Sequence, residues 1–272
     1  MLLAIDVGNT QTVAGVYQGS ELLHHWRVST VRTATVDELA AQHDKILELR
    51  GGSLTGVDAM AVSSVVPTLT VAYRELAGRY MDRPALVVGP GVRTGMALAI
   101  DNPHELGADR LVNAVAAFRR YGGPCLVVDF GTATNIDAVS ERGEYLGGVI
   151  APGLEISVEA LASRAARLLK VDLVAPANTI GKSTVEALQS GIVYGTVAMV
   201  DGLVARLKGE LGPSSLTVAT GGLAELIAPL SDQIDEHEPF LTLEGLRIIH
   251  ELNVAPREPE ARGPALGARR PA

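Results

Sequence analysis

Apolar and polar positions alternate along the chain in blocks that are typical of an α/β protein. Short runs rich in Val, Ile and Leu, bounded by Gly, Pro or Ser, predict strands at 13–17, 22–28, 57–66, 85–88, 125–128, 136–139, 145–151 and 216–219. Apolar positions at helical spacing predict helices at 37–49, 69–81, 108–120, 155–170 and 181–208, with another starting near Leu223. From residue 57 onward strands and helices alternate, which indicates parallel strands joined by right-handed crossovers.

Two apolar runs end in the same polar pattern. Asp6 is followed two residues later by Gly8, and Asp129 by Gly131, with Thr and Asn side chains next in both places. A glycine after a strand lets the backbone turn close to a ligand, and exposed N–H groups and hydroxyls there suit a phosphate. For one copy alone, a buried strand capped by an Asx turn is the favoured explanation of the pattern. The repetition favours the phosphate interpretation.

The spacing of the two patterns predicts the domain organisation. The aspartates lie 129 − 6 = 123 positions apart in a chain of 272 residues, which indicates one sheet and one turn in each half. We therefore expect α/β domains at about 1–120 and 121–256, with a cleft between the facing turns. Residues 257–272, rich in Pro, Arg and Gly, are expected to be disordered.

Three further segments contain residues suited to ligand binding or catalysis. Gly221 lies in a Thr-Gly-Gly sequence after a predicted strand, which suits the passage of a nucleotide near the backbone. Asp109 and Arg110 open a helix after Gly107, and this carboxylate is either a complement to the helix dipole or a base beside an anion-binding group. Trp26 either faces a ligand or packs at the rim of the fold.

The sequence IGKST at 180–184 does not fit a nucleotide-binding P-loop. That motif requires a glycine five positions before Gly181, where this chain has Pro176, and no apolar strand leads into it. A helix N-terminus carrying Lys182, Ser183 and Thr184 can still hold an anionic or hydroxylated substrate. The glycines of the following helix, Gly191 and Gly195, permit close packing at a subunit interface.

The composition of the chain limits which binding partners and which cellular compartment are expected. The formal net charge is −8 without a basic stripe, which argues against nucleic acid as a partner and favours a small molecule. The one cysteine, Cys125, lies in a predicted buried strand, which excludes an intrachain disulfide and indicates the reducing cytoplasm. We see no signal peptide and no run of about 18 apolar residues, so no membrane contact is expected.

Taken in order, the motifs resemble those of the superfamily of acetate and sugar kinases, heat-shock chaperones and actin, and within it the type III pantothenate kinases. The segments that carry the resemblance span nearly everything up to Asn253. They are DVGNT at Asp6, WRVST at Trp26, SSVVP at Ser63, DNPHELGADRLVNA at Asp101, VDFGTATNID at Val128, GEYLGGVIAPGL at Gly143, IGKST at Ile180, SGIVYG at Ser190, TGG at Thr220 and GLRIIHELN at Gly245.

The resemblance implies two ribonuclease H-like (actin-like ATPase) domains with ATP in the cleft between them, and phosphorylation of pantothenate to 4′-phosphopantothenate, the first step of coenzyme A synthesis. It implies that ATP is held by Asp6, Val7, Gly8, Asn9, Thr10, Gln11, Thr12, Val13 and Thr132. It assigns pantothenate to Gly107, Ala108, Asp109, Arg110 and Thr184, with Asp109 as catalytic base. Asp129 would bind the monovalent cation, K⁺ or NH₄⁺, that this family uses in addition to Mg²⁺.

The usual assembly of the family is a homodimer. One departure concerns Ile100, where many members have a tyrosine that contacts the substrate. Two alternative functions remain open: a non-catalytic ATP-binding regulator with the same fold, and a kinase of another small hydroxy acid. Retention of Asp6, Asp109, Arg110, Asp129 and Thr184 together favours an enzyme, because a protein that only binds ATP needs no base.

Overall fold

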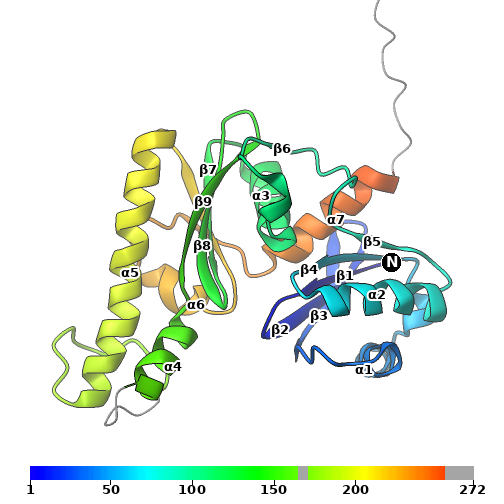
Figure 1. The fold of residues 1–272 in the computed structure, drawn as a ribbon, viewed down its shortest axis with the longest axis horizontal. Helices are drawn as coiled ribbons and strands as arrows, with labels where there is room; N and C mark the ends of the chain where they lie inside the picture. The colour runs from blue at the N-terminus through cyan, green and yellow to red at the C-terminus, as the bar shows by residue number, and fades with distance from the viewer. Residues whose placement is uncertain (165–170, 255–272) are drawn as a thin grey trace, which may run out of the picture.

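The computed structural model describes residues 1–164 and 171–254, which form two separate β-sheets (Figure 1). The first sheet has the strand order β3-β2-β1-β4-β5. Its strands are β1 (Leu2–Val7), β2 (Gln11–Gln18), β3 (Glu21–Ser29), β4 (Ala59–Ser64) and β5 (Ala85–Val87). The first three strands are antiparallel, whereas β4 and β5 run parallel to β1.

The second sheet repeats this plan with the strand order β11-β10-β7-β8-β9-β6. Its strands are β6 (Ala97–Leu98), β7 (Cys125–Phe130), β8 (Ala133–Val139), β9 (Glu144–Pro152), β10 (Leu216–Thr220) and β11 (Glu236–His237). Here β7, β8 and β9 form the antiparallel part, and β10 runs parallel to β7 as β4 does to β1. The strands β1 and β7 therefore occupy equivalent positions.

In residues 1–164 and 171–254, seven α-helices connect and cover these sheets. They are α1 (Val36–Glu48), α2 (Pro67–Tyr80), α3 (Ala108–Tyr121), α4 (Leu154–Arg164), α5 (Thr184–Leu211), α6 (Ala224–Ile227) and α7 (Leu241–Val254). Single 3₁₀ turns lie at Leu54–Gly56, Pro103–Glu105 and Ala228–Leu230. Local sequence explains where several helices start: Thr35 and Glu38 form a capping box before α1, and Pro67 occupies the first turn of α2.

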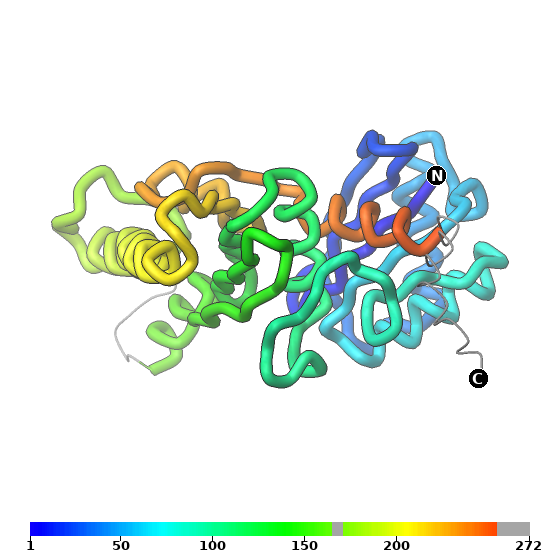
Figure 2. The backbone as a smooth tube through the Cα atoms, turned by 90° about the horizontal axis from the view of Figure 1, so that it is seen from above, coloured from blue at the N-terminus to red at the C-terminus, as the bar shows by residue number. Residues whose placement is uncertain are grey.

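The elements form five layers. Helices α1 and α2 cover the outer face of the first sheet through a cluster that contains Leu3, Val62 and Tyr73. Helices α5 and α6 cover the outer face of the second sheet. Between the sheets lie α3 and α7, whose side chains share one core with residues of both sheets (Figure 1). Seen from above, the molecule is elongated and α7 runs along the first half (Figure 2).

These observations confirm the predicted α/β class and most of the predicted elements. The long helix starts at Thr184 rather than at Gly181, because Ser183 caps it by accepting a hydrogen bond from the Glu186 amide. Of the helix predicted at 155–170, residues 165–170 lie outside the described residues, as does the tail at 257–272. A domain boundary near residue 120 stays a proposal, since β6 joins the second sheet and α7 contacts the first.

Helix α5 is long and apolar, although the sequence analysis predicted no membrane contact. Over an 18-residue window its mean hydropathy is 1.3, which is enough by length and composition to cross a membrane. One face, with Val193, Val197, Val200 and Val204, packs into the core beneath the second sheet. Only 28% of that window is buried, however. The opposite face is left exposed.

Candidate active site

The first Asp-x-Gly turn joins β1 to β2. The Gly8 amide donates to the Gln11 carbonyl at 3.0 Å, and a Cβ on Gly8 would lie 2.9 Å from that oxygen, so the tight turn requires glycine. Behind the turn, the Thr30 hydroxyl donates to the Gly8 carbonyl at 2.9 Å and lies 2.9 Å from the Thr12 hydroxyl. Thr12 therefore braces the turn from inside the fold.

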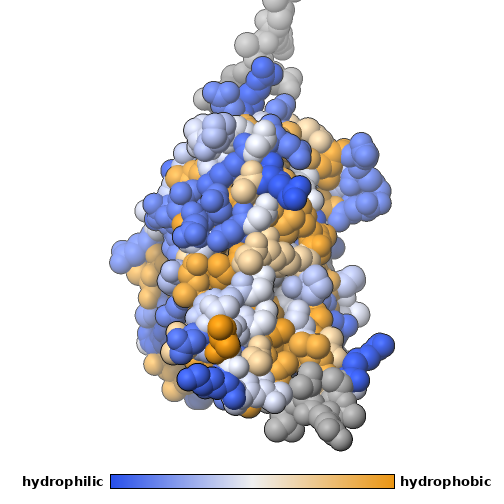
Figure 3. All heavy atoms as spheres, turned by 90° about the vertical axis from the view of Figure 1, so that its left-hand side faces the viewer, coloured by the Kyte–Doolittle hydropathy of each residue, from blue (hydrophilic) through white to orange (hydrophobic). Residues whose placement is uncertain are grey.

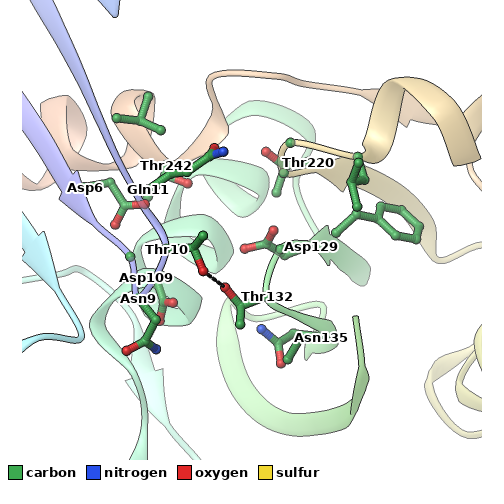
Figure 4. A pocket seen from close by; sticks show the side chains of 18 of the residues that line it. Asp6, Asn9, Thr10, Gln11, Asp109, Asp129, Thr132, Asn135, Thr220 and Thr242 are labelled. Atoms are coloured by element: carbon green, nitrogen blue, oxygen red, sulfur yellow. Dashed lines mark hydrogen bonds between the residues drawn. The ribbon is translucent and has the colours of Figure 1, made fainter. Parts of the chain in front are cut away.

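The second turn faces the first across a cavity of about 440 Å³ (Figure 4). It joins β7 to β8, and its Thr132 hydroxyl lies 3.0 Å from the Thr10 hydroxyl of the first turn. This contact joins residues 122 positions apart in the sequence. The geometry expected from the repeated pattern, two turns facing each other, is therefore present.

The third glycine segment lies on the second-sheet side of the cavity. Gly221 has φ +94°, and a Cβ there would lie 2.4 Å from an oxygen of Asp129, so only glycine fits. The Asp129 carboxylate also accepts a hydrogen bond from the Asn113 amide at 3.2 Å. Thr242 at the start of α7 donates in turn to Asn113 at 2.7 Å. Asp129 is therefore held by α3, and through it by α7.

Asp109 enters the cavity from the first turn of α3. Its carboxylate accepts a hydrogen bond from the Arg110 amide at 2.8 Å, and Gly107 caps the helix without a side chain. Asp109 lines the cavity with Asp6 and Asp129, so one space collects three aspartates (Figure 4).

Burial raises the pKa of all three aspartates, and neighbouring carboxylates add to the rise at Asp6 and Asp129. Burial and the neighbouring Asp109 and Asp129 charges raise the pKa of Asp6 to about 8, although the Ser63 hydroxyl opposes the effect. Burial, with Asp109 and Asp137, raises the pKa of Asp129 to about 7. Burial also raises the pKa of Asp109, against the Arg110 charge and amide. Such a cluster is suited to cations or to proton transfer.

Arg110 is not part of the cavity lining, and its guanidinium pairs with a carboxylate that the sequence did not single out. Its Nε and Nη2 donate to Asp137 Oδ1 at 2.9 and 2.5 Å, and the Tyr145 hydroxyl donates to the same oxygen at 2.6 Å. Asp137 and Tyr145 are fully buried. An aspartate between Ile136 and Ala138 in an apolar strand is a weak signal, which gains meaning only when its arginine partner is known.

Only some of the predicted site residues lie together around the cavity. The predicted residues that line the cavity are Asp6, Gly8, Asn9, Thr10, Gln11, Val13, Asp109, Asp129 and Thr132. Val7 and Thr12 are buried away from it, and Gly107, Ala108 and Arg110 flank it without lining it. Ile100 packs against the core formed around α3.

Thr184 lies apart from the cavity. It is exposed at the start of α5, where the Lys182 amide donates to the Glu186 carboxylate at 2.7 Å. The segment at 180–184 is therefore a helix cap in this chain.

Strand alternation resolves the orientation of Trp26 and adds a residue that the sequence analysis did not assign. Trp26 is buried under α1, and its Nε1 donates to His43 Nδ1 at 3.2 Å. Its neighbour Arg27 must face the other way, and it lines the cavity. Other cavity residues that were not predicted include Asn135, Glu155 and Thr242, whereas Thr220 belongs to the Thr-Gly-Gly segment singled out from the sequence.

Comparison with known proteins identifies relatives along nearly the full chain. The family model described as type III pantothenate kinase matches residues 2–206. A protein of Streptomyces griseus subsp. griseus named type III pantothenate kinase is 55% identical over 263 residues, covering 94% of this chain and 99% of its own length. One of the same name from Moorella thermoacetica is 51% identical over 253 residues, covering 93% and 100%.

Solved structures share the fold at low identity. A protein from Campylobacter jejuni assigned to the Baf family of transcriptional activators is 20% identical, with a TM-score of 0.56 over 92% of this chain and 98% of its own. The ethanolamine utilization protein EutJ from Carboxydothermus hydrogenoformans is 16% identical, with a TM-score of 0.55 over 91% and 89%. With the repeated sheets, these likenesses bear out the predicted fold of two ribonuclease H-like halves.

Proposed function

Since the chain belongs to the type III pantothenate kinases, we propose that it transfers the γ-phosphate of ATP to the 4′-hydroxyl of pantothenate, giving 4′-phosphopantothenate, the first step of coenzyme A synthesis. One observation carries the proposal: both Asp-x-Gly turns and Asp109 line the same cavity. The turns supply donors for phosphate groups, and Asp109 supplies a proton acceptor beside them.

In this proposal ATP lies between the sheets, with its phosphates along the first turn and near the Thr10 and Thr132 hydroxyls. The hydroxyl oxygen of pantothenate bonds to the γ-phosphorus, the bond to the bridging oxygen of ADP breaks, and Asp109 accepts the hydroxyl proton. Burial raises the pKa of Asp109, which makes the carboxylate a stronger proton acceptor.

The aspartates also fit the cations that we include in the proposal. Asp6 Oδ1 is buried and lacks a hydrogen-bond partner in the described residues, and carboxylate oxygens are ligands suited to both Mg²⁺ and K⁺. We assign Mg²⁺ to Asp6 and the monovalent cation, K⁺ or NH₄⁺, to Asp129. When bound, these cations would offset the charge of the phosphates. Burial and neighbouring carboxylates raise the pKa of both aspartates, and a bound cation would favour their charged forms.

Arg110 is proposed to hold the pantothenate carboxylate. Asp137 engages its Nε and Nη2, while within residues 1–164 and 171–254 no acceptor engages Nη1. The buried pair thus fixes the plane of the guanidinium and leaves one terminal nitrogen for an anion.

We propose a homodimer formed through the exposed face of α5, in the cytoplasm. This face has the small residues Gly191, Gly195, Ala198 and Gly202, all of which are exposed. Apolar side chains gather on this side of the molecule (Figure 3). A second copy would cover them, and Thr184 of the partner subunit could then approach a substrate that Thr184 does not reach within its own chain.

The dimer is tested by Gly195→Glu, which places a charge on this face, with Gly78→Glu on exposed α2 as matched control. A Cβ at either glycine meets no atom within 4 Å, so both variants should fold. We expect sedimentation to give a dimer for the wild type and the control, and a monomer for Gly195→Glu. A wild-type monomer would contradict the proposal.

The function is tested by ADP release from the purified protein with Mg²⁺, K⁺ or NH₄⁺, and pantothenate, compared with glycerol and acetate. We expect turnover that depends on pantothenate. ADP release with another hydroxy acid would favour the kinase alternative. ATP binding without turnover on any of them would favour a regulator, a possibility in keeping with the Baf family assignment of the Campylobacter jejuni protein.

A further inference from the structure

Arg27 is distinguished by its position in the first sheet. The pairing of β1 with β2 places Asp6 opposite Val13, and the pairing of β2 with β3 places Val13 opposite Arg27. Residues paired in this way lie on the same face of a sheet. Arg27 therefore projects from the face that carries Asp6, two strand spacings or about 10 Å away.

The side chain of Arg27 extends across the cavity to the second sheet. Its Nη1 lies 2.8 Å from the place that a Cβ on Gly222 would occupy, so the guanidinium rests against the backbone after β10. On the other side, Nη1 donates to the Gln11 side chain at 3.0 Å. Arg27 thus lies between two of the glycine turns that border the cavity.

No carboxylate in the described part of the chain forms an ion pair with Arg27. Of the described residues lining the cavity, four are acidic, namely Asp6, Asp109, Asp129 and Glu155, and Arg27 alone is basic. A polyanion entering this acidic space needs a positive partner, and arginine is well suited to phosphate oxygens.

We propose that Arg27 is a nucleotide-binding residue that grips the polyphosphate of ATP from the first sheet, opposite the backbone of Gly221 and Gly222. A phosphate oxygen takes the place of Gln11 as the acceptor of Nη1. The assignment rests on the proposed function, in that it requires ATP to bind in this cavity. It adds a side chain of β3 to the contacts that the glycine turns make.

The test is calorimetric binding of ATP, ADP and adenosine to Arg27→Gln and Arg27→Lys, without pantothenate. Arg74→Gln, on exposed α2 and outside the cavity lining, is the matched control. Losing a charge-assisted bond should weaken ATP and ADP binding by about 10- to 100-fold in Arg27→Gln. Arg27→Lys should lie in between, because it keeps the charge but not the fork of donors. Adenosine affinity should be unchanged.

In steady-state kinetics the KM for ATP should rise in Arg27→Gln while the KM for pantothenate stays constant. Unchanged or tighter ATP binding would overturn the assignment. Arg27 would then serve only to link the two sheets. An equal loss for adenosine would overturn it as well, because the phosphates would then not be involved. A wild-type protein that bound ATP without phosphorylating pantothenate would refute the proposed function and leave the assignment of Arg27 standing.

Discussion

Gly107→Ala should inactivate the enzyme by moving a carboxylate, without removing any functional group. Gly107 has φ −60° and ψ 141°, which any residue adopts, so the backbone is not strained by the change. The new Cβ would lie 2.5 Å from Asp109 Oδ1, whereas ordinary contact begins at 3.4 Å, so the oxygen must move by about 0.9 Å. A misplacement of about 1 Å can cost roughly 10²-fold in rate.

The structural cost of that shift is small. The carboxylate would at worst lose its 2.8 Å hydrogen bond from the Arg110 amide, about 0.5–1.5 kcal/mol, which lowers the melting temperature by at most about 5 °C. We therefore expect kcat to fall about 100-fold with ATP binding preserved, measured by ADP release and calorimetry. Gly78→Ala, where a Cβ meets no atom within 4 Å, is the control. Turnover of Gly107→Ala within about threefold of wild type would refute the placement of Asp109 at the reacting hydroxyl.

Three other predictions concern the aspartates and a buried histidine. Asp109→Asn keeps the shape but removes the proton acceptor, so kcat should fall at least ~100-fold while the melting temperature hardly changes; near-normal turnover would exclude Asp109 as base. Replacing K⁺ by Na⁺ should lower activity, and Asp129→Ala should weaken the use of ATP; equal rates in all salts would contradict the cation assignment. Burial lowers the pKa of His43 from 6.5 to about 4, so its contribution to stability is complete above pH 6.5 and is lost as the pH falls toward 4. Urea unfolding at pH 7 and pH 4 should show about 3 kcal/mol more acid destabilisation in the wild type than in His43→Gln, and equal losses would refute it.

The elements that could be predicted well from the sequence are those determined by residues close together in the chain. The apolar strands ending at Asp6 and Asp129 are recognisable because β-branched runs and glycine turns depend on neighbours in the chain. The two-residue strands β6 and β11 were missed, since each exists only through pairing with a distant strand. The local sequence pattern does not indicate which distant strand will be the partner.

The same division holds for the site. The turn residues and Asp109 could be proposed from motifs, whereas Asp137 could not, because its role depends on Arg110 and Tyr145 meeting it in space. Arg27 was within reach of sequence reasoning: once Trp26 is assigned to the core, alternation along the strand sends its neighbour to the opposite face. What sequence alone did not give was the approach of Gly222 from the other sheet.

The position of α7 has a consequence for how the protein is made. The inner face of the first sheet, with Leu2 and Ala4, is covered by Leu243 and Leu246 from the last described helix. During synthesis the first half emerges early, but its core stays open on this face until residues 241–254 leave the ribosome. Thr242, which positions Asn113 and through it Asp129, arrives in the same late segment. A nascent chain therefore acquires a finished core and a finished site together, once residues 241–254 have been synthesised.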